Sequence, residues 1–351
     1  MQIYQRRFGL SKLAWVAAVL LLVMLSGCGS QSPSTGGNSS SSDTTKLAVV
    51  AGGPHPYFAP MPGATQDAQH AFHISGTTYR VPTSFALNDE NQAIESLASQ
   101  GYNALAIYPD DANGSNATIA ELKGRGIPVA EIGACTKQPS PALFCLATDV
   151  YQAAYSATKN LIQAMGGQGK IVHLTGLLTD PNTTLREQAV QKAVAETNGA
   201  VQLVQTIADI DTPGPADTAV HNLLASQGDI INGIVATAYN PAVAAAKALT
   251  DTQNTHIKLV GIDTDPIVIK AIQEGYAAGT MEQNPYGQAY IAAYALDLIV
   301  SHGCKMKVGA PFQIDSGTTF ITKDNANNYV AASQTVTTQI QQSFKSKYLS
   351  C

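Results

Sequence analysis

The chain has no long apolar run after its N-terminal region and no cluster of lysine or arginine. Beyond residue 25, no segment reaches the roughly 18 consecutive apolar residues that a membrane-spanning helix needs. The full sequence carries 20 Lys and Arg against 25 Asp and Glu, a formal net charge of -5. An acidic balance without a basic cluster argues against nucleic acid as a partner. The only tryptophan, Trp15, lies near the N-terminus.

Common enzyme signatures are also missing. The sequence holds neither a Gly-x-Ser-x-Gly nucleophile elbow nor a His-Glu-x-x-His zinc helix. Residues 166–170, Gly-Gly-Gln-Gly-Lys, look faintly like a phosphate loop, but Ile171 stands where Ser or Thr is needed. A turn between a helix and a strand explains that segment better. We therefore predict a protein without catalytic residues that is not an enzyme, with no cofactor and no metal site.

An export signal is present at the N-terminus. A basic stretch at residues 6–12 precedes the apolar run Leu13–Leu25, which is too short to span a bilayer. Residues 25–28, Leu-Ser-Gly-Cys, resemble the lipobox of bacterial lipoproteins, in which the thiol of Cys28 is acylated and Cys28 becomes the first residue of the mature chain. The alternative is an ordinary secretory signal that ends in a cysteine by chance.

A tether follows the predicted signal. Residues 29–45 consist almost wholly of Ser, Gly, Thr, Gln, Asn and Pro. This composition buries too little apolar surface to offset its ordering entropy, so it is typical of a flexible linker. We expect residues 1–27 to be a signal peptide and residues 28–45 to be a lipid anchor and tether. The folded part would then be held at the extracytoplasmic face of a bacterial membrane through lipid on Cys28.

Four cysteines remain beyond Cys28: Cys135, Cys145, Cys304 and Cys351. An even count in an exported chain favours disulfides, and Cys135 with Cys145 would close one short loop. Cys304 would then pair with Cys351, the alternative being free thiols. A metal site is disfavoured because no cysteine has CxxC spacing and no histidine lies at ligand spacing.

Short apolar runs alternate with helical patterns in two successive halves of the chain. This alternation predicts an α/β fold with parallel sheets covered by helices, and about 300 residues suit two such lobes with a cleft between them. Ligands of such sheets bind beyond the carboxyl ends of the strands, so the following loops are candidate sites. Strands are expected at 47–51, 79–81, 104–107, 127–129, 171–174, 201–207, 231–235, 259–262 and 278–281.

A series of short segments carries a family resemblance. The segments, read in chain order, are 46–50 with 56–58, 101–109, 126–129, 147–149, 169–176, 185–190, 260–263 and 283–286. Their order and spacing resemble the type I periplasmic binding proteins, specifically the ribose-like sugar-binding branch that serves ABC importers. The resemblance covers the chain from about Lys46 to Thr322. It implies two Rossmann-like lobes joined by three crossings, with the ligand cleft between them.

The resemblance also implies lobe boundaries. The chain would cross between lobes near Gln163, Gln283 and Phe312. The N-terminal lobe would then comprise residues 46–163 plus 284–312, and the C-terminal lobe residues 164–283 plus 313–351.

The resemblance assigns ligand-binding residues as well. A sugar hydroxyl needs both a donor and an acceptor, while the CH faces of the ring need an apolar platform. By position, Arg186 would donate to the ligand and Gln283 would supply an amide. Tyr57 and Phe58 would pack on one face of the ligand. Asp149 and Asp263 would accept hydrogen bonds from its hydroxyls. The alternatives are that Asp263 is a helix cap and that Arg186 is a solvated helix residue.

The chain departs from the family pattern at three loops. Gly133-Ala134 stands where Asp-Arg is usual, and His55 stands where an amide is common. Residues 238–241, Ala-Tyr-Asn-Pro, replace a usual Asn-Asp, so Tyr239 would either contact the ligand or only cover the hinge. These differences argue against ribose itself as the ligand.

The expected function is that of a monomeric, lipid-anchored receptor that captures a sugar or polyol and presents it to an ABC permease. Within the same fold, the alternative is a sensor subunit that reports the ligand to a membrane kinase or chemoreceptor without transport. A secreted α/β hydrolase would need a nucleophile or metal cluster that the sequence lacks. A repressor of related fold would need an N-terminal DNA-binding helix pair, and the signal and tether occupy that place.

Overall fold

The computed structural model describes residues 44–178 and 180–351. The predicted signal peptide, the lipid attachment at Cys28 and nearly all of the tether lie outside these residues. Within the described part, no helix combines the length and apolar character needed to cross a membrane.

The first lobe, called here the N lobe, is built on a parallel sheet. In spatial order its strands are β2 (Gly76–Arg80), β1 (Lys46–Val50), β3 (Ala104–Ile107), β4 (Val129–Ile132), β5 (Cys145–Ala147) and β12 (Gln313–Asp315). The central strands are apolar at nearly every position, with Lys46 and Glu131 as exceptions, because both faces of the sheet are covered.

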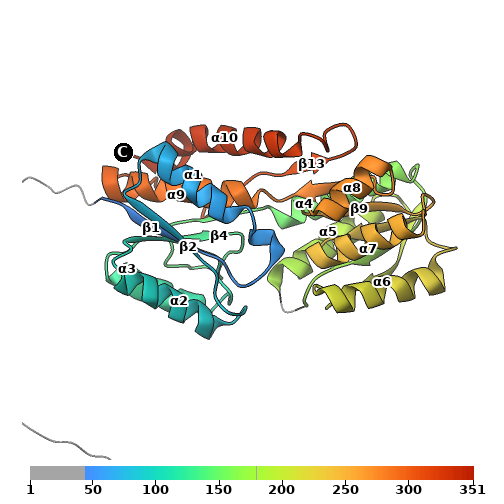
Figure 1. Ribbon diagram of the computed structural model, residues 1–351, viewed down its shortest axis with the longest axis horizontal. Coiled ribbons are helices and arrows are strands. Elements are labelled where there is room, and N and C mark those ends of the chain that lie inside the picture. Colours follow the sequence, from blue (N-terminus) through green and yellow to red (C-terminus); the bar gives the residue numbers. More distant parts are fainter. Residues whose placement is uncertain (1–43, 179) are drawn as a thin grey trace, which may run out of the picture. The chain divides into compact units, whose positions relative to one another are not determined.

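Helices cover the two faces of the N-lobe sheet from opposite sides (Figure 1). Leu47 and Val49 of β1 pack with α1 (Met61–Phe72) and α9 (Pro285–His302), whereas Ala48 and Val50 pack with α2 (Leu87–Ser99) and α3 (Ser115–Gly124). The two-residue period of a strand thus divides one apolar run between two cores. The short 3₁₀ helix η1 (Pro56–Phe58) follows β1.

The second lobe, called here the C lobe, repeats this plan. Its strands are β7 (Val201–Ile207), β6 (Gly169–Leu174), β8 (Gly233–Ala236), β9 (Lys258–Ile262), β10 (Gly279–Glu282) and the antiparallel β13 (Thr319–Ile321). One face packs against α4 (Val150–Ala164) and α5 (Pro181–Ala195). The other packs against α6 (Pro213–Gln227), α7 (Tyr239–Asp251) and α8 (Pro266–Glu274). The fold is therefore the expected α/β arrangement of two lobes.

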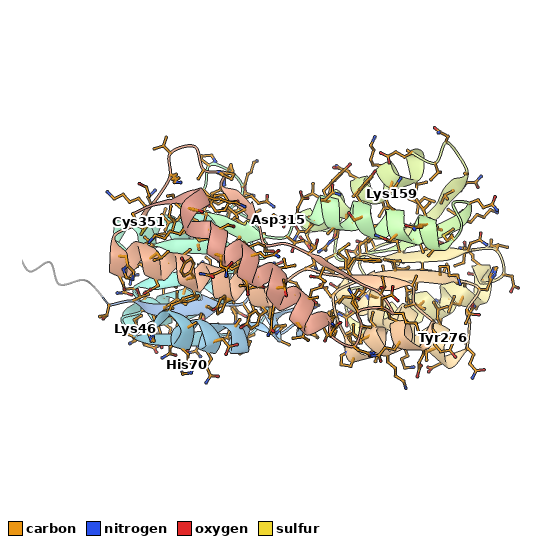
Figure 2. The ribbon with its side chains drawn as sticks, turned by 90° about the horizontal axis from the view of Figure 1, so that it is seen from above. Lys46, His70, Lys159, Tyr276, Asp315 and Cys351 are labelled. Carbon is orange, nitrogen blue, oxygen red and sulfur yellow. A yellow bond between two sulfur atoms is a disulfide. The ribbon has the colours of Figure 1, made fainter. Side chains whose placement is uncertain are left out.

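Two of the expected lobe boundaries are wrong. Helix α4 packs on β8 and β9 of the C lobe, so the first crossing lies at Thr148–Asp149 and not near Gln163. Strand β12 still belongs to the N-lobe sheet, so the later crossing follows Asp315 and not Phe312. Asp315 lies where the two lobes meet (Figure 2). The crossing near Gln283 falls where expected, between β10 and α9.

The C-terminal segment, expected in the C lobe, spans both lobes. Helix α10 (Tyr329–Tyr348) begins with Tyr329 against the C-lobe core and ends with Phe344 in the N-lobe core, 5.4 Å from the ring of Phe144. Beyond it, β14 (Leu349–Ser350) pairs with β11 (Lys305–Met306) of the N lobe. The final residues therefore belong to the N lobe, because their apolar side chains complete its core.

Both cysteine pairs expected from the sequence form disulfides. Cys135 is joined to Cys145 across the β4–β5 connection. Cys304, just after α9, is joined to Cys351. The second bond fastens the C-terminal strand to the end of α9.

Candidate ligand-binding site

The sheet order locates the edge where a site is expected. In the N lobe, β1 lies between β2 and β3, and in the C lobe β6 lies between β7 and β8, so each sheet has a topological switch point at these strands. The loops that leave neighbouring strands there diverge to opposite faces and open a space for a ligand. The loops after β1, β3, β6 and β8 are therefore the first place to look.

Three predicted residues form one buried row in the C lobe. The side-chain amide of Gln283 donates to Asp263 Oδ1 at 2.6 Å, and Arg186 Nη2 donates to Gln283 Oε1 at 3.3 Å. All three side chains are buried. Within the described part of the chain, Arg186 Nε has no hydrogen-bond partner. The structure thus brings together three residues that are far apart in the sequence and leaves a guanidinium donor unused.

One acid of this row, Asp263, and one acid next to it, Glu282, have raised pKa values. Asp263 follows β9 in the left-handed backbone region, with φ 72°. Burial raises its pKa to about 6, although the Gln283 hydrogen bond and the nearby Arg186 charge lower it. Burial also raises the pKa of the neighbouring Glu282 to about 7, and Glu282 accepts a hydrogen bond from Thr264. The C-lobe side therefore offers both a fixed donor and carboxyl acceptors.

The N-lobe side is aromatic. His55 caps η1, because its Nδ1 accepts a hydrogen bond from the backbone of Tyr57 at 3.1 Å. The Tyr57 hydroxyl donates to Gln288 of α9 at 2.7 Å. Phe58, only 3% exposed, packs edge-to-face on Tyr108 with ring centroids 5.1 Å apart. Both aromatic residues expected from the sequence thus belong to one cluster at the switch point.

The two lobes meet at His55. Its ring lies edge-on to the ring of Tyr239, with centroids 5.4 Å apart, and its Nε2 lies 3.8 Å from Asp211 Oδ2. Tyr239 in turn donates to Asp265 at 2.7 Å. Burial alone would raise the pKa of Asp211, but the His55 contact and hydrogen bonds from Asn240 lower it below its ordinary value. Tyr239 therefore covers the junction between the lobes.

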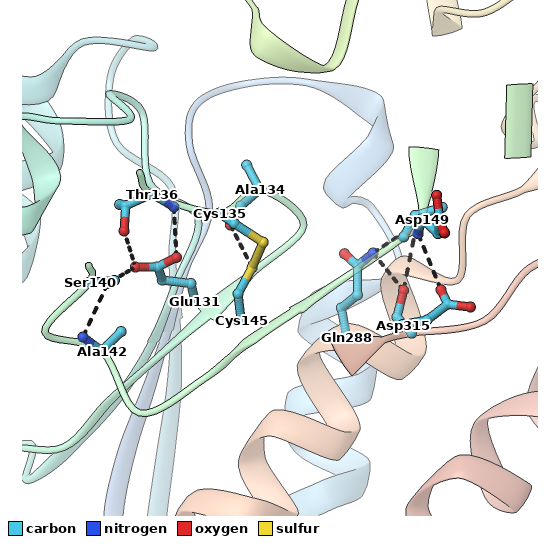
Figure 3. The surroundings of a disulfide bond; sticks show 12 residues. Glu131, Ala134, Cys135, Thr136, Ser140, Ala142, Cys145, Asp149, Gln288 and Asp315 are labelled. Atoms are coloured by element: carbon cyan, nitrogen blue, oxygen red, sulfur yellow. Dashed lines mark hydrogen bonds between the residues drawn. A yellow bond between two sulfur atoms is a disulfide. The ribbon is translucent and has the colours of Figure 1, made fainter. Parts of the chain in front are cut away.

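Asp149 does not join this group. Its side chain is exposed and caps α4 by accepting from the backbone of Gln152 at 2.9 Å. Its own backbone N–H donates to Asp315 at 3.2 Å (Figure 3). The structure thus gives Asp149 the role of a helix cap at the first crossing.

Tyr108 was not among the predicted ligand-binding residues, although it lies in a loop beyond a strand end and in the segment 101–109 that carries the resemblance. A Cβ on Gly52 would lie 2.6 Å from its Cδ1, and a Cβ on Gly133 would lie 2.9 Å from its Cδ2. The Tyr108 ring therefore fills space that the side chains of the usual Asp-Arg pair would need. Burial raises its pKa, as does the charge of Asp180 in the C lobe, while Arg186 lowers it. The missing pair at 133–134 was the only sequence signal for this exchange.

One group of potential metal ligands occurs among the described residues, at Glu131, Cys135 and Cys145. Both sulfurs belong to the disulfide, so they offer no thiolate (Figure 3). The Glu131 carboxylate accepts from Thr136 and Ser140. The disulfide and these hydrogen bonds explain why the three residues lie together, since they stabilise the β4–β5 connection.

Comparison with known proteins identifies the family. Residues 48–303 match the periplasmic binding protein domain family. The chain belongs to this family. This match confirms the resemblance, and the curated relatives are named as binding proteins, in agreement with the expectation of a protein that is not an enzyme.

Two curated relatives illustrate the similarity. The chain is 27% identical over 237 residues to a xylitol-binding protein of Mycolicibacterium smegmatis, covering 67% of this chain and 65% of the relative. It is 25% identical over 237 residues to the ribose import binding protein of Bacillus subtilis, covering 66% of this chain and 75% of that protein. The match thus spans about two thirds of the length of the first relative.

Solved structures show the same fold. An ABC transporter solute-binding protein from Burkholderia graminis, in complex with D-arabinose, aligns with a TM-score of 0.73 at 22% identity, over 82% of this chain and 98% of that one. A solute-binding protein from Actinobacillus succinogenes with bound D-allose aligns with a TM-score of 0.73 at 20% identity, over 81% of this chain and 100% of that one.

Proposed function

We propose that this protein captures a sugar or polyol between its two lobes and delivers it to an ABC importer. The observation that carries the proposal is the buried row of Arg186, Gln283 and Asp263 in one lobe. Among the described residues, the Arg186 Nε donor of this row has no partner. A polyhydroxylated ligand supplies both acceptors for the guanidinium and donors for the carboxyls. The aromatic cluster around Phe58 provides the apolar side that the CH groups of a sugar need.

The relatives support this ligand class. Curated relatives are named for binding xylitol and ribose, and solved structures of the same fold hold D-arabinose and D-allose. Five-carbon and six-carbon polyhydroxylated compounds are therefore the first candidates for this chain.

A thermal-shift screen of the purified protein tests the proposal. The panel contains pentoses, hexoses, pentitols and nucleosides, with amino acids as a class that lacks a polyhydroxylated ring. A ligand at 100 times its Kd stabilises the folded state by about 2.7 kcal/mol. We expect a rise of several degrees in the melting temperature with at least one sugar or polyol. A shift with amino acids and with no sugar or polyol would contradict the proposal.

We also propose that the protein is exported and held at the membrane through lipid on Cys28, as the Leu-Ser-Gly-Cys sequence at 25–28 indicates. The test is fractionation of cells that express the wild type or Cys28→Ala. The variant should appear in the soluble exported fraction, while the wild type stays with the membrane. Equal membrane retention of both would exclude the anchor.

A further inference from the structure

Asp110 is a half-buried acid to which the proposed site assigns no role. It lies just beyond β3, at the switch point of the N lobe. Both of its carboxylate oxygens are buried, and neither has a hydrogen-bond partner among the residues that the structure describes. Its backbone N–H donates to Glu90 Oε2 at 2.8 Å, and Ser115 donates to the same oxygen at 2.9 Å. Glu90 is fully buried, and in the same described part its Oε1 is also unpartnered.

Such an arrangement is costly for folding. Buried polar groups in native proteins are nearly always hydrogen-bonded, and an unpaired buried carboxyl is among the most expensive exceptions. Burial, together with the nearby charges of Glu90 and Asp89, raises the pKa of Asp110 to about 8. A buried carboxyl without a hydrogen-bond partner lowers stability, and such unfavourable arrangements are expected mainly at functional sites.

The surroundings of Asp110 connect it to the interlobe site. A Cβ on Gly52, in the loop after β1, would lie 2.5 Å from Asp110 Oδ1 and 2.6 Å from Tyr108 Cδ1. Tyr108 in turn lies within the electrostatic influence of Arg186 and of Asp110 itself. The absence of a side chain at Gly52 leaves the carboxyl against the loop that carries His55.

Phe85 lies close to Gly52 as well, on another loop of the N lobe. Its ring is 49% exposed, and a Cβ on Gly52 would lie 3.0 Å from its Cε1. The ring centroid lies 6.1 Å from that of Phe58 and 6.2 Å from that of His55. The loop that bears Phe85 is held in place, because Ser84 donates to Asp89 of α2 at 2.7 Å. A half-exposed aromatic ring on a fixed loop offers a flat apolar surface to a ligand.

We propose that Asp110 and Phe85 are specificity-determining residues of the sugar site. Asp110 hydrogen-bonds one hydroxyl of the ligand, and Phe85 packs on the adjacent CH groups. The inference rests on the proposed function, and it supplies a carboxyl on the N-lobe side, where Gly133-Ala134 lacks the usual Asp-Arg pair and Tyr108 fills the space. A site with Asp110 at this position selects ligands that present a hydroxyl toward the end of β3.

The test combines stability with affinity. The variants are Asp110→Asn, Asp110→Ala and Phe85→Ala, with Asp229→Asn, an exposed acid of the C lobe, as the control. We expect the ligand-free melting temperature of Asp110→Asn to equal or exceed that of the wild type, because an unpaired buried acid is removed. Affinity for the sugar found in the screen should fall at least tenfold in Asp110→Ala and severalfold in Phe85→Ala. The control should bind as the wild type does.

Monodeoxy analogues of that sugar locate the contact. For one analogue, the wild type and Asp110→Ala should bind equally, because the hydroxyl and its partner form a single interaction in a double-mutant cycle. If Asp110→Ala and Phe85→Ala bind every analogue within twofold of the wild type, the inference is overturned while the proposed function stands. If the wild type binds no sugar or polyol, the proposed function itself fails.

Discussion

Buried acids dominate the chemistry of this protein at the scale of single residues. Burial raises the pKa of Asp263 to about 6, of Glu282 and Glu90 to about 7, and of Asp110 to about 8. In the unfolded chain these groups titrate near pH 4. Their protonated forms therefore favour folding, and this contribution is lost as the pH rises from about 4 through 8.

The stability of the ligand-free protein should accordingly fall with rising pH. We expect a higher melting temperature at pH 5.5 than at pH 8.5, measured by thermal denaturation at constant ionic strength. Further acidification is opposed by His173, whose pKa burial lowers to about 3, so its contribution is lost as the pH falls below about 6.5. Asp110→Asn should flatten the slope and the exposed control Asp229→Asn should not. A melting temperature that rises between pH 5.5 and 8.5 would contradict this reasoning.

A second prediction concerns Gly133. It has φ 74°, and Tyr108 lies 2.9 Å from where its Cβ would be. Gly133→Ala should therefore suffer both backbone strain and overpacking, the latter costing about 1–3 kcal/mol. Gly126 of the same lobe has φ 77° with open space around it, so Gly126→Ala measures the strain alone. Urea denaturation should show the larger loss for Gly133→Ala, and equal losses would mean that Tyr108 can move aside.

At the scale of elements, the sequence predicted the long apolar strands because their patterns are local, but it did not predict the short strands β5, β12 and β13. Apolar runs such as 104–107 indicate strands buried on both faces, and these form the sheets observed. The partner of α4 could not be predicted in the same way. Ala157 and Leu161 show that this helix has a buried face, but the pattern does not say which sheet covers it. The lobe boundary at Gln163 was wrong for that reason.

Only those residues of the site that belong to a sequence motif could be predicted. Arg186, Asp263 and Gln283 belong to motifs of the family and come together as a row. Tyr108 lies in a loop that the strand pattern makes a candidate, but its contacts could not be predicted, because they depend on two glycines, Gly52 and Gly133, that lie far from it in the sequence. Contacts of this kind exist only after the sheet has formed.

The two disulfides should differ in their value to stability. Cys304 and Cys351 are 47 residues apart, whereas Cys135 and Cys145 are 10 apart. A longer closed loop restricts the unfolded chain more. The Cys304–Cys351 bond should therefore contribute about 4 kcal/mol and the Cys135–Cys145 bond about 3 kcal/mol or less. Chemical denaturation of the two double Cys→Ala variants compares them. A larger loss for the Cys135–Cys145 variant would show that the loop-length argument fails here.

At the scale of the whole molecule, the described residues form two similar lobes linked by three short crossings. Thr148 of the first crossing donates to the backbone of Gln283 at the second, and Asn284 donates to the backbone of Ser316 at the third at 2.6 Å. Thr337 of α10 donates to Asn284 as well, so the C-terminal helix is bonded to the same hinge. A ligand that contacts both lobes would stabilise the arrangement in which they meet.

The central claim is that a polyhydroxylated ligand binds between the lobes through Arg186. Isothermal titration calorimetry with the sugar or polyol found in the screen tests it most directly, comparing the wild type, Arg186→Ala and Lys192→Ala. Lys192 lies on the same helix with its side chain exposed, so it controls for the loss of a positive charge. Removing a buried charged partner costs about 2–5 kcal/mol, so Arg186→Ala should bind about thirtyfold more weakly or worse. Lys192→Ala should match the wild type, whereas unchanged affinity in Arg186→Ala would contradict the account.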